Sequence, residues 1–552
     1  MAAGASLSIP KPAPVAVLPD GPAANSSSGS LIDQRSRPAS GAAGMLVFGL
    51  ALIAGSTYAA SHLVRDLSGV HLLSAWPYVL LGVALAIALG FEFVNGFHDT
   101  ANAVATVIYT NSLEPHFAVV WSGLWNLIGV LTSSGAVAFA IMSLLPVELI
   151  LQVGKGAGFA MVFSLLIAAI LWNLGTWWLG LPASSSHTLI GSIIGVGLAN
   201  QLIGARAGTS GIDWEQARNV FKVLLISPIV GFGISALLLL ALKLVVRKPE
   251  LYESPKGSQP PPFWIRCLLI LTCTGVSFGH GSNDGQKGMG LIMLILIGTV
   301  PPAYALNHAI GIDQMHDFIA VSQQAEQVLD RTIAPAPPVA DPRAELTASI
   351  RSRHLTPAAP AALRQMIEEI DREVVLYKSL SGVPASQQQN VRNDMYIASE
   401  SLRLLAKSGQ PQIAPADAAV LASYKKQLDR STKYIPSWVK VAVALALGLG
   451  TMVGWRRIVV TVGERIGKQH LTYAQGAAAQ IVAAATILAA DSFHMPVSTT
   501  HVLSSGVAGT MAANGSGLQL STIRNIALAW VFTLPAAALL AAGLFWVMRQ
   551  FI

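Results

Sequence analysis

Two short polar motifs, each present twice in the chain, contain the residues best suited to chemistry. The first spans residues 96–102 and recurs at 281–287, and each copy contains an aspartate. The second spans 182–187 and recurs at 496–501, and each copy contains a proline, three hydroxyl side chains and a histidine. Carboxylates hold cations or protons, whereas hydroxyls and free N–H groups at a helix start hold oxyanions. The motifs therefore predict a site for an anion that is accompanied by a cation or a proton.

The candidate site residues fall into three groups. The groups that could hold an oxyanion are Asn102, Ser184, Ser185, Ser186, Asn283, Lys287, Ser498, Thr499 and Thr500. The candidates for holding a metal ion or a proton are Asp99 and Asp284. The side chains that could orient these groups or carry protons are His98, His187, His501, Glu92 and Asp491.

Each group also has a structural interpretation. The aspartates could cap helix ends, and at least one hydroxyl of each triplet is expected to be only an N-cap. Either His187 or His501 could simply bond a backbone carbonyl. Lys287 could extend to a membrane interface, and the acids Glu92 and Asp491 could pair with a neighbouring Asn, Gln or His. The duplication of the aspartate favours function, because an ionised carboxylate in an apolar stretch is costly.

The composition indicates that membrane helices must position these residues. Of 552 residues, 53% are hydrophobic and 11% are charged, against roughly 25% charged in soluble domains. A soluble enzyme and a nucleic-acid-binding protein are both disfavoured. The formal net charge of +7 instead indicates membrane orientation and anionic lipid headgroups as contacts. The two cysteines exclude a disulfide framework or a cysteine metal site.

The apolar stretches predict ten to twelve membrane passages in an all-α polytopic protein. They begin with 44–64 and continue at 77–95, 117–145, 158–181, 188–203, 220–246, 264–280, 289–309, 436–454, 474–490, 502–513 and 523–548. A span needs about 20 apolar residues, so the short stretches 188–203 and 502–513 are interpreted as half-helices or re-entrant segments.

Polar composition divides the rest of the chain. Residues 1–43 form a predicted disordered tail, 44–309 the first membrane repeat and the start of the second, and 436–552 its remainder. Between them, 310–435 contain 14 Lys and Arg and 14 Asp and Glu, and predict a partly helical soluble insertion. Helical patterns occur at 361–380 and 390–407. Basic loops near Arg247 and Arg456 are expected in the cytoplasm by the positive-inside rule. The insertion is placed there too, although its own charge is neutral.

The motif spacing indicates a duplicated unit. Asp99 precedes His187 by 88 residues, and Asp284 precedes His501 by 217; the difference of 129 is close to the 126 residues of 310–435. Duplicated units in membranes are typical of transporters with inverted repeats, in which broken helices meet near the midplane. Glycines in the first motif permit unwound backbone and close approach, and both are expected here. Pro182 and Pro496 predict helix starts, whose N–H groups would face a bound anion.

At these motifs the sequence resembles the inorganic phosphate transporter (Pit) family, which carries a duplicated G-A-N-D-x-x-N-A-type signature and P-x-S-x-T-H-like segments. The stretches 91–106 and 280–288 are most similar to its bacterial low-affinity branch. The resemblance covers most of 77–310 and 436–545. It implies symport of inorganic phosphate through a multi-pass protein of the bacterial inner membrane. In that branch it implies proton-coupled uptake of neutral metal–phosphate complexes, with Mg²⁺ or a similar co-transported metal and no tightly bound cofactor.

Two departures from the family signature bear on the coupling ion. His98 stands where the signature has an Asn before the aspartate, and Lys287 replaces the second Asn of the second copy. We hypothesise that the ammonium of Lys287 fills the place of a sodium ion in sodium-driven relatives, which makes Na⁺ less expected than H⁺ or a metal. Other readings remain open: sodium-coupled phosphate symport, transport of a related oxyanion such as sulfate, and a channel or transporter-like nutrient sensor. A homodimer is possible.

A serine–histidine hydrolase is disfavoured. In Ser186-His187 and Thr500-His501 the two side chains are sequence neighbours, which cannot easily present the imidazole to the hydroxyl, and the chain has no nucleophile elbow. A hydrolase also leaves the duplication unexplained. The sequence therefore predicts a transporter and not an enzyme.

Overall fold

The computed structural model describes residues 42–68, 76–99, 101–151, 156–203, 212–255, 257, 259–332 and 338–551. Within these ranges the chain is helical with connecting loops, and the only β-pairing is an isolated bridge between Gly467 and Leu518. The predicted all-α fold class is confirmed. Most of the predicted tail, residues 1–41, lies outside the described residues.

The helices fall into three sets along the chain. Before the insertion they are α1 Ala42–Ser68, α2 Trp76–Asp99, α3 Ala101–Tyr109, α4 Pro115–Thr132, α5 Ala136–Met142, α6 Val147–Leu151, α7 Gly156–Trp178, α8 Ser185–Ile203, α9 Trp214–Val245, η1 Pro249–Leu251, α10 Phe263–Thr299 and α11 Pro301–Tyr304. In the insertion they are α12 Ile312–Thr332, α13 Pro342–Ser352, α14 Ala359–Tyr377, η2 Leu380–Gly382, α15 Gln388–Ser408 and α16 Pro415–Thr432. After it they are α17 Ser437–Met452, α18 Arg456–Val460, η3 Thr461–Arg465, α19 Tyr473–Ser492, α20 Thr499–Asn514 and α21 Leu520–Met548.

In the described ranges seven helices are long and apolar enough to cross a membrane, or up to nine if each of two bent helix pairs is one span. This is fewer than the ten to twelve passages expected. One reason is that the separate apolar stretches 264–280 and 289–309 belong mainly to one continuous helix, α10, of 37 residues. Of the two predicted half-helices, α20 has 16 residues, whereas α8 has 19 and is long enough to be a span.

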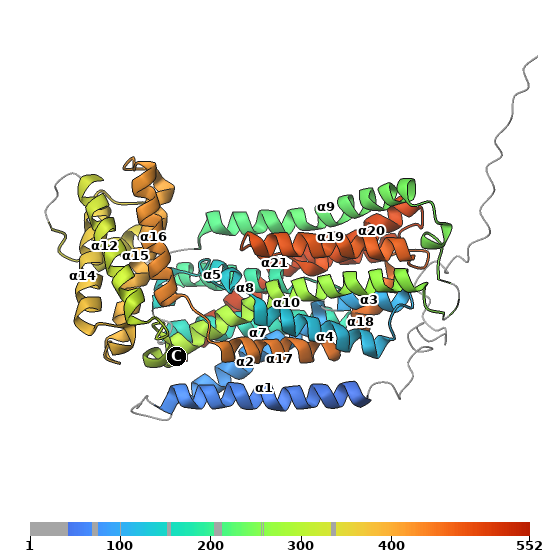
Figure 1. Cartoon of the computed structure of the whole chain (residues 1–552), viewed down its shortest axis with the longest axis horizontal. Coiled ribbons are helices and arrows are strands. Elements are labelled where there is room, and N and C mark those ends of the chain that lie inside the picture. The colour runs from blue at the N-terminus through green and yellow to red at the C-terminus, as the bar shows by residue number, and fades with distance from the viewer. Residues whose placement is uncertain are drawn as a thin grey trace, which may run out of the picture.

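The two halves of the membrane region are inverted relative to each other (Figure 1). Helices α2 and α10, which carry the two aspartate motifs, run in opposite directions along the bundle. The packing recurs in pairs: α8 packs on α21 as α20 packs on α9, and α4 packs on α10 as α17 packs on α2. The two halves are therefore interleaved, and their motifs meet where the halves face each other.

Glycines make this interleaving possible at equivalent positions. A Cβ on Gly195 of α8 would lie 2.0 Å from the carbonyl oxygen of Ala538, and one on Gly509 of α20 would lie 2.2 Å from that of Phe232. Both glycines stand eight residues after the motif histidine of their half. Any larger residue would push the paired helices apart, so the duplicated glycines set the helix spacing.

The expectation of unwound backbone is wrong for the second aspartate motif. Helix α10 continues without a break through residues 281–287. The motif glycine there serves close approach instead, since a Cβ on Gly281 would lie 2.1 Å from the carbonyl oxygen of Asn126 in α4. In the first motif α2 ends at Asp99 and α3 begins at Ala101.

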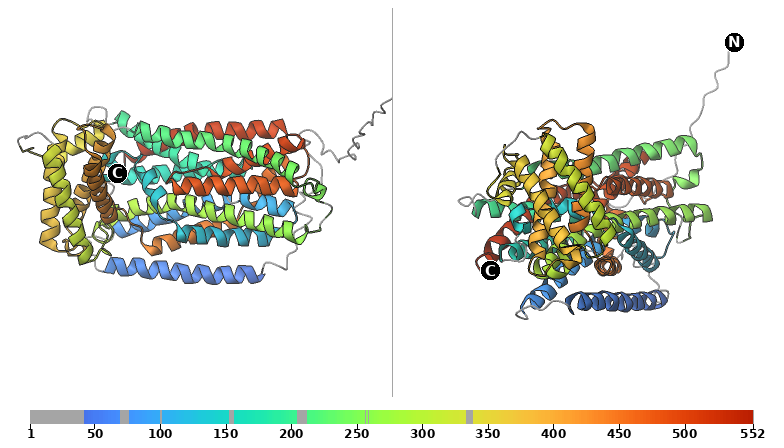
Figure 2. Two further views of the ribbon diagram at one scale, coloured as in Figure 1. Left: turned by 45° about the horizontal axis from the view of Figure 1, so that its top comes forward. Right: turned by 60° about the vertical axis from the view of Figure 1, so that its left-hand side comes forward.

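The insertion forms a separate bundle at one end of the membrane helices (Figure 2). Its predicted helices at 361–380 and 390–407 correspond to α14 and α15. Helix α9 begins at this end, where Glu215 pairs with Lys407 of α15, and its 32 residues extend to the far end.

The basic loops lie at that far end. The loop with Arg247 follows α9, and α18 with Arg456 lies at the same end (Figure 1). The expectations that the basic loops and the insertion are both cytoplasmic therefore cannot hold together. The insertion is neutral and gives no orientation signal of its own, so the side of the membrane on which it lies stays a prediction.

Candidate functional site

The N-termini of α8 and α20 meet between the two repeats. Ser184 caps α8 by accepting a hydrogen bond from the backbone N–H of His187 (3.2 Å), and Ser498 caps α20 by accepting one from that of His501 (3.1 Å). The hydroxyl of Ser186 donates to the carbonyl oxygen of Val497 (3.0 Å), which joins the two helix starts directly. One hydroxyl of each triplet is therefore an N-cap.

Both helix starts direct a hydroxyl at the carboxylate of Asp99. Ser185 of α8 donates to its Oδ2, and Thr500 of α20 donates to its Oδ1 over 2.8 Å. The Nδ1 atom of His98 lies 3.0 Å from Oδ1, while its Nε2 lies 3.1 Å from the hydroxyl of Thr176. Asp99 as a residue is only 3% exposed. Asp99 thus links the two repeats, and His98 is fixed as its neighbour.

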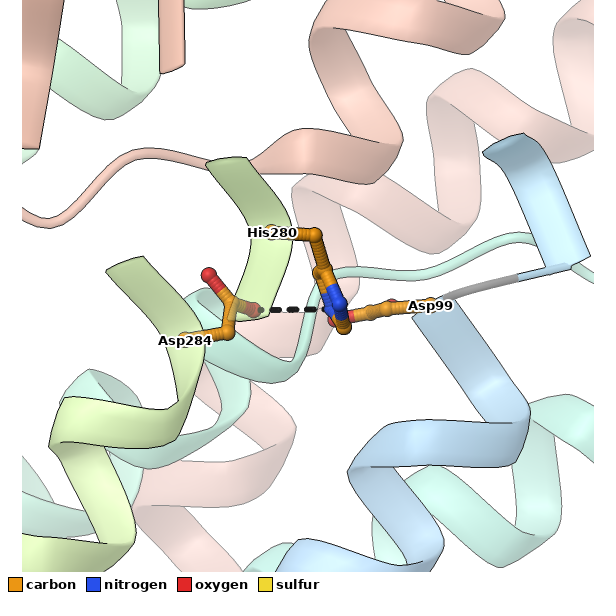
Figure 3. A group of neighbouring side chains, drawn as sticks. All are labelled: Asp99, His280 and Asp284. Carbon is orange, nitrogen blue, oxygen red and sulfur yellow. Dashed lines mark ion pairs between the residues drawn. The ribbon is translucent and has the colours of Figure 1, made fainter. Parts of the chain in front are cut away.

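The second motif carboxylate, Asp284, lies beside Asp99 (Figure 3). The hydroxyl of Ser185 lies within 3.4 Å of Asp284 Oδ2, so it stands between the two carboxylates. The ammonium of Lys287 is 2.6 Å from the same oxygen. In the described part of the chain the other oxygen, Oδ1, is buried without a hydrogen-bond partner. This oxygen is available to a cation.

His280 is the site residue that the sequence interpretation missed. Its Nε2 lies 3.6 Å from Asp284 Oδ2, and ligand atoms of Asp99, His280 and Asp284 all lie within 4.8 Å of one another (Figure 3). The Nδ1 atom lies 2.6 Å from Asn126 Oδ1, and the amide of Asn126 is oriented by donating to the carbonyl oxygen of Ser122 (3.0 Å).

This second contact sets the histidine tautomer. Asn126 Oδ1 can only accept, so Nδ1 of His280 carries the proton and Nε2 keeps its lone pair. That lone pair is directed at the two carboxylates. A histidine whose outer nitrogen is held in this way is typical of a metal ligand, and the four-residue spacing from Asp284 was the available sequence signal.

Lys287 is buried in the site and does not extend to an interface. The residue is 1% exposed, and its ammonium donates to the hydroxyl of Ser186 over 2.5 Å in addition to its contact with Asp284. It therefore joins α10 to the N-terminal turn of α8.

The motif histidines form a second cluster. The rings of His187 and His501 have centroids 4.3 Å apart, and His501 also packs on Trp530 at 4.1 Å. Three ring nitrogens of this cluster are buried without a hydrogen-bond partner in the described part of the chain: both of His501, and Nδ1 of His187. The expectation that either histidine bonds a backbone carbonyl is therefore not met by these three nitrogens.

Two further oxyanion candidates can be placed, and one cannot. The amide of Asn283 donates to the carbonyl oxygen of Met495 (3.1 Å) and accepts from the N–H of Val497 (3.3 Å), so it holds the segment that leads into α20. The hydroxyl of Thr499 is buried with no hydrogen-bond partner among the described residues. The side chain of Asn102 lies outside the described residues.

The two remaining acids lie apart from the pair of carboxylates. Glu92 is fully buried, packs where a Cβ on Gly288 would be, and is contacted by Asn95 (3.3 Å). Asp491 accepts from the hydroxyl of Ser282 (2.6 Å) and from the amide of Gln286 (2.8 Å), so it fastens α19 to α10. Each acid thus pairs with an amide side chain, Glu92 with Asn95 and Asp491 with Gln286, which is one of the two interpretations given for them.

These features define a multi-pass membrane transporter with a polar site between inverted repeats. The chain belongs to the phosphate transporter family, whose sequence profile matches residues 95–541. The family consists of transporters and not of enzymes, as predicted.

Similar proteins include bacterial phosphate transporters. The chain is 44% identical over 498 residues to the low-affinity inorganic phosphate transporter PitB of Escherichia coli strain K12, which covers 87% of this chain and 99% of that protein. It is 39% identical over 483 residues to a low-affinity inorganic phosphate transporter of Buchnera aphidicola (from Acyrthosiphon pisum), covering 85% and 96%. A solved structure titled "The sodium-dependent phosphate transporter" has a TM-score of 0.48 and 20% identity, and covers 86% of this chain and 100% of its own. The two bacterial relatives and the family match support the predicted multi-pass bacterial membrane protein.

Proposed function

We propose that this transporter carries inorganic phosphate together with a divalent metal ion, as a neutral complex coupled to a proton, by alternating access between the two repeats. The observation that supports the proposal most strongly is the convergence on Asp99. One hydroxyl from each repeat, Ser185 and Thr500, donates to this buried carboxylate. Groups suited to an anion and groups suited to a cation therefore occur at the same point.

The charges in the site explain why the anion needs a companion. With both carboxylates ionised and the histidines neutral, Asp99, Asp284 and Lys287 sum to one negative charge. This charge repels phosphate at close range in a low-dielectric interior. A proton on one carboxylate brings the sum to zero, and a divalent cation brings it to one positive charge. Binding of the anion therefore depends on binding of the cation.

The donor set fits a divalent cation. Asp99, His280 and Asp284 offer two carboxylate oxygens and one imidazole nitrogen within a few ångströms of one another. Hard ions such as Mg²⁺ prefer the carboxylates and retain water, and softer divalent ions also accept imidazole. Phosphate oxygens would then bridge from the metal to the hydroxyls and N–H groups at the starts of α8 and α20.

The position of Lys287 supports a mechanism without sodium. Its ammonium contacts Asp284 and Ser186, which is where a small monovalent cation would join a carboxylate to a helix start. A tethered ammonium cannot be transported, so the energy has to come from an ion that binds elsewhere in the site. A proton on Asp99 or Asp284 meets that requirement.

Alternating access follows from the interleaved packing. The contacts that surround the site connect one repeat to the other, as Thr500 to Asp99 and Lys287 to Ser186 do. Rocking of one repeat against the other would break these contacts on one side of the site and form equivalent ones on the other.

Radiolabelled phosphate uptake into proteoliposomes tests the proposal. The purified chain is reconstituted, and an inward proton or sodium gradient is imposed with and without Mg²⁺. We expect uptake to be driven by protons and raised by Mg²⁺. Sodium-driven uptake would overturn the argument from Lys287. Suppression of uptake by unlabelled sulfate would indicate that the site also accepts sulfate. Absence of any gradient-dependent uptake would favour a sensor.

A further inference from the structure

A large apolar cavity lies between α1 and the membrane helices beside it, apart from the site described above. Its volume is about 440 Å³, within the range of about 300–1,000 Å³ that is typical of ligand pockets. Helix α1 runs along the outside of the bundle and packs on α17 (Figure 1). The walls come from α1, α2 and α17, and Ile292 of α10 also lines the cavity. Among the described residues, membrane helices alone therefore enclose it.

Helix α1 is fastened to the bundle at two points. Gly55 allows a close approach, since a Cβ there would lie 2.5 Å from Cδ1 of Leu445 in α17. Eleven residues later, Asp66 accepts hydrogen bonds from the hydroxyl of Tyr304 (2.8 Å) and from the indole N–H of Trp438 (3.2 Å). Between these points the cavity is lined by four α1 residues, three of them small, which leaves the space unfilled: Ser56, Ala59, Ala60 and Leu63.

The lining of the cavity suits an apolar occupant and not water. Among the described residues that line it, the polar side-chain atoms are the hydroxyl of Ser56 and the indole nitrogen of Trp438, and that N–H is already bonded to Asp66. A buried water needs about two to four polar partners, and cavities lined by apolar groups stay dry. An empty space of this size would also leave the side chains of its walls without dispersion contacts.

The length of the cavity matches one leaflet of a bilayer. Its α1 wall extends from Leu52 to Leu63, which are about 16 Å apart along an α-helix, and half of a hydrocarbon core of about 30 Å is about 15 Å. Asp66, Tyr304 and Trp438 lie just beyond the Leu63 end. Tyr304 and Trp438 flank the insertion in the chain, and Tyr and Trp are enriched at membrane surfaces. The cavity therefore extends from a membrane surface toward the middle of the bilayer.

We propose that this cavity binds one acyl chain of a membrane phospholipid, with the polar end of the lipid near Asp66. The surrounding bilayer presents such chains at this depth and in this orientation. Lipid tails are as apolar as the walls of the cavity, so binding is driven by van der Waals packing against α1, α2 and α17 and not by the hydrophobic effect.

A bound chain would contact both helices that carry the aspartate motifs. On α2 the wall includes Phe93, which follows Glu92, and on α10 it includes Ile292, five residues after Lys287, or about 7.5 Å along the helix. Glu92 in turn packs where a Cβ on Gly288 would be. A filled cavity would therefore support the packing of α2 on α10. Its binding does not depend on the proposed metal-coupled transport, because none of the described residues of the transport site lines the cavity.

Photo-cross-linking of the full chain in a bilayer tests the site. The protein is reconstituted into phosphatidylcholine liposomes that contain a small fraction of phosphatidylcholine with a diazirine in one acyl chain. After irradiation, mass spectrometry of the peptides locates the labelled residues. We expect labels on the α2 and α17 walls, at 85–93 and 442–449. Labels on the exposed surface of α9 report contact with bulk lipid in the same sample.

The decisive variant fills the cavity. Ala442→Leu combined with Ala446→Leu adds two larger side chains to the α17 wall, so labelling of the α2 wall should be lost while labelling of α9 remains. The matched control is Ala241→Leu combined with Ala527→Leu, on exposed positions of α9 and α21, which should keep the wild-type pattern. Ser56→Leu fills the cavity from α1 and serves if the first double variant does not fold.

The outcomes separate the possible occupants. Absence of label on the α2 wall of the wild type, or equal label in the filled variant, would overturn the site. A second copy of the chain seated on α1 would exclude the probe and give a dimer in light scattering of the detergent-solubilised protein, which would also overturn it. The labels should persist in Asp284→Asn, so failure of this proposal is distinguishable from failure of the transport mechanism.

Discussion

The ammonium of Lys287 lies 2.6 Å from the carboxylate of Asp284, three residues earlier on α10, and both side chains are buried. The same ammonium donates to Ser186 at the start of α8. A buried ion pair of this kind is costly to form and more costly to break from one side, because the remaining partner keeps an uncompensated charge. Changing one member of the pair alone is therefore expected to destabilise the site.

Removal of the ammonium alone should be more damaging than removal of both charges. In Lys287→Met we expect phosphate uptake to fall more than tenfold and the melting temperature to fall, since a broken buried pair costs about 3–5 kcal/mol. Adding Asp284→Asn should restore the melting temperature but not uptake. Lys243→Gln, on the partly exposed surface of α9, is the control. Wild-type uptake by Lys287→Met would contradict a role in the site.

Loss of the second carboxylate should stop coupled uptake without unfolding the protein. Asp284→Asn keeps the shape of the side chain but removes the charge that holds a metal or a proton. Proteoliposome uptake should be abolished while the variant inserts and elutes normally in detergent. The matched control is Asp491→Asn, whose carboxylate fastens α19 to α10 apart from the paired carboxylates and whose uptake should stay within a few-fold of wild type. Undiminished uptake by Asp284→Asn would remove this residue from the mechanism.

The amide of Asn126 should affect the affinity for the metal ion through His280, without being a ligand itself. In Asn126→Ala, Nδ1 of His280 loses its acceptor, and the lone pair of Nε2 is no longer held toward the carboxylates. Changes in such supporting groups cost about 10–100-fold in metal affinity. We therefore expect the concentration of a softer divalent ion such as Mn²⁺ for half-maximal uptake to rise by that factor, with smaller effects on the Mg²⁺ requirement and on the maximal rate. A lower maximal rate at an unchanged Mn²⁺ requirement would indicate a purely structural role.

Much of the site could be predicted because the chemistry is duplicated. Two copies of each motif show which polar residues belong to the same site. The order of the motifs along the chain predicts that this site lies between two repeats. The starts of α8 and α20 and their caps Ser184 and Ser498 followed from local rules for helix termini. These rules involve only residues that are near each other in the chain, so helix starts and caps can be predicted from the sequence.

The remainder depends on tertiary packing, which a single sequence does not show. Asn126 orients His280 although 154 residues separate them, and no local pattern connects the two. The continuous course of α10 through residues 281–287 was also missed, because glycines permit both unwinding and close approach. Only the neighbouring helix α4 decides between these alternatives.

The insertion should lose stability as the pH rises toward neutrality. Burial raises the pKa of Asp371 in α14 from 3.8 to about 7, so the folded state binds the proton more tightly than the unfolded state. The contribution of this proton binding to the free energy of unfolding is fully present below about pH 4. It is lost progressively as the pH rises to about 7. Asp371→Asn should raise the melting temperature relative to wild type at pH 8 and change it little at pH 4, as followed by circular dichroism of the full chain. The exposed Asp317→Asn is the control, and equal pH profiles for wild type and Asp371→Asn would contradict the assignment.

Widening one interleaved contact should weaken both stability and transport. In Gly509→Ala the new Cβ would lie 2.2 Å from the carbonyl oxygen of Phe232, so α20 and α9 must move apart. Overpacking of this kind costs about 1–3 kcal/mol, and it displaces Thr500 from Asp99. We expect a lower melting temperature and reduced phosphate uptake. Gly233→Ala on α9, where a Cβ meets nothing within 4 Å, should keep both values or gain stability through its higher helix propensity. Similar losses in the two variants would show that helix spacing at Gly509 is not what positions the site.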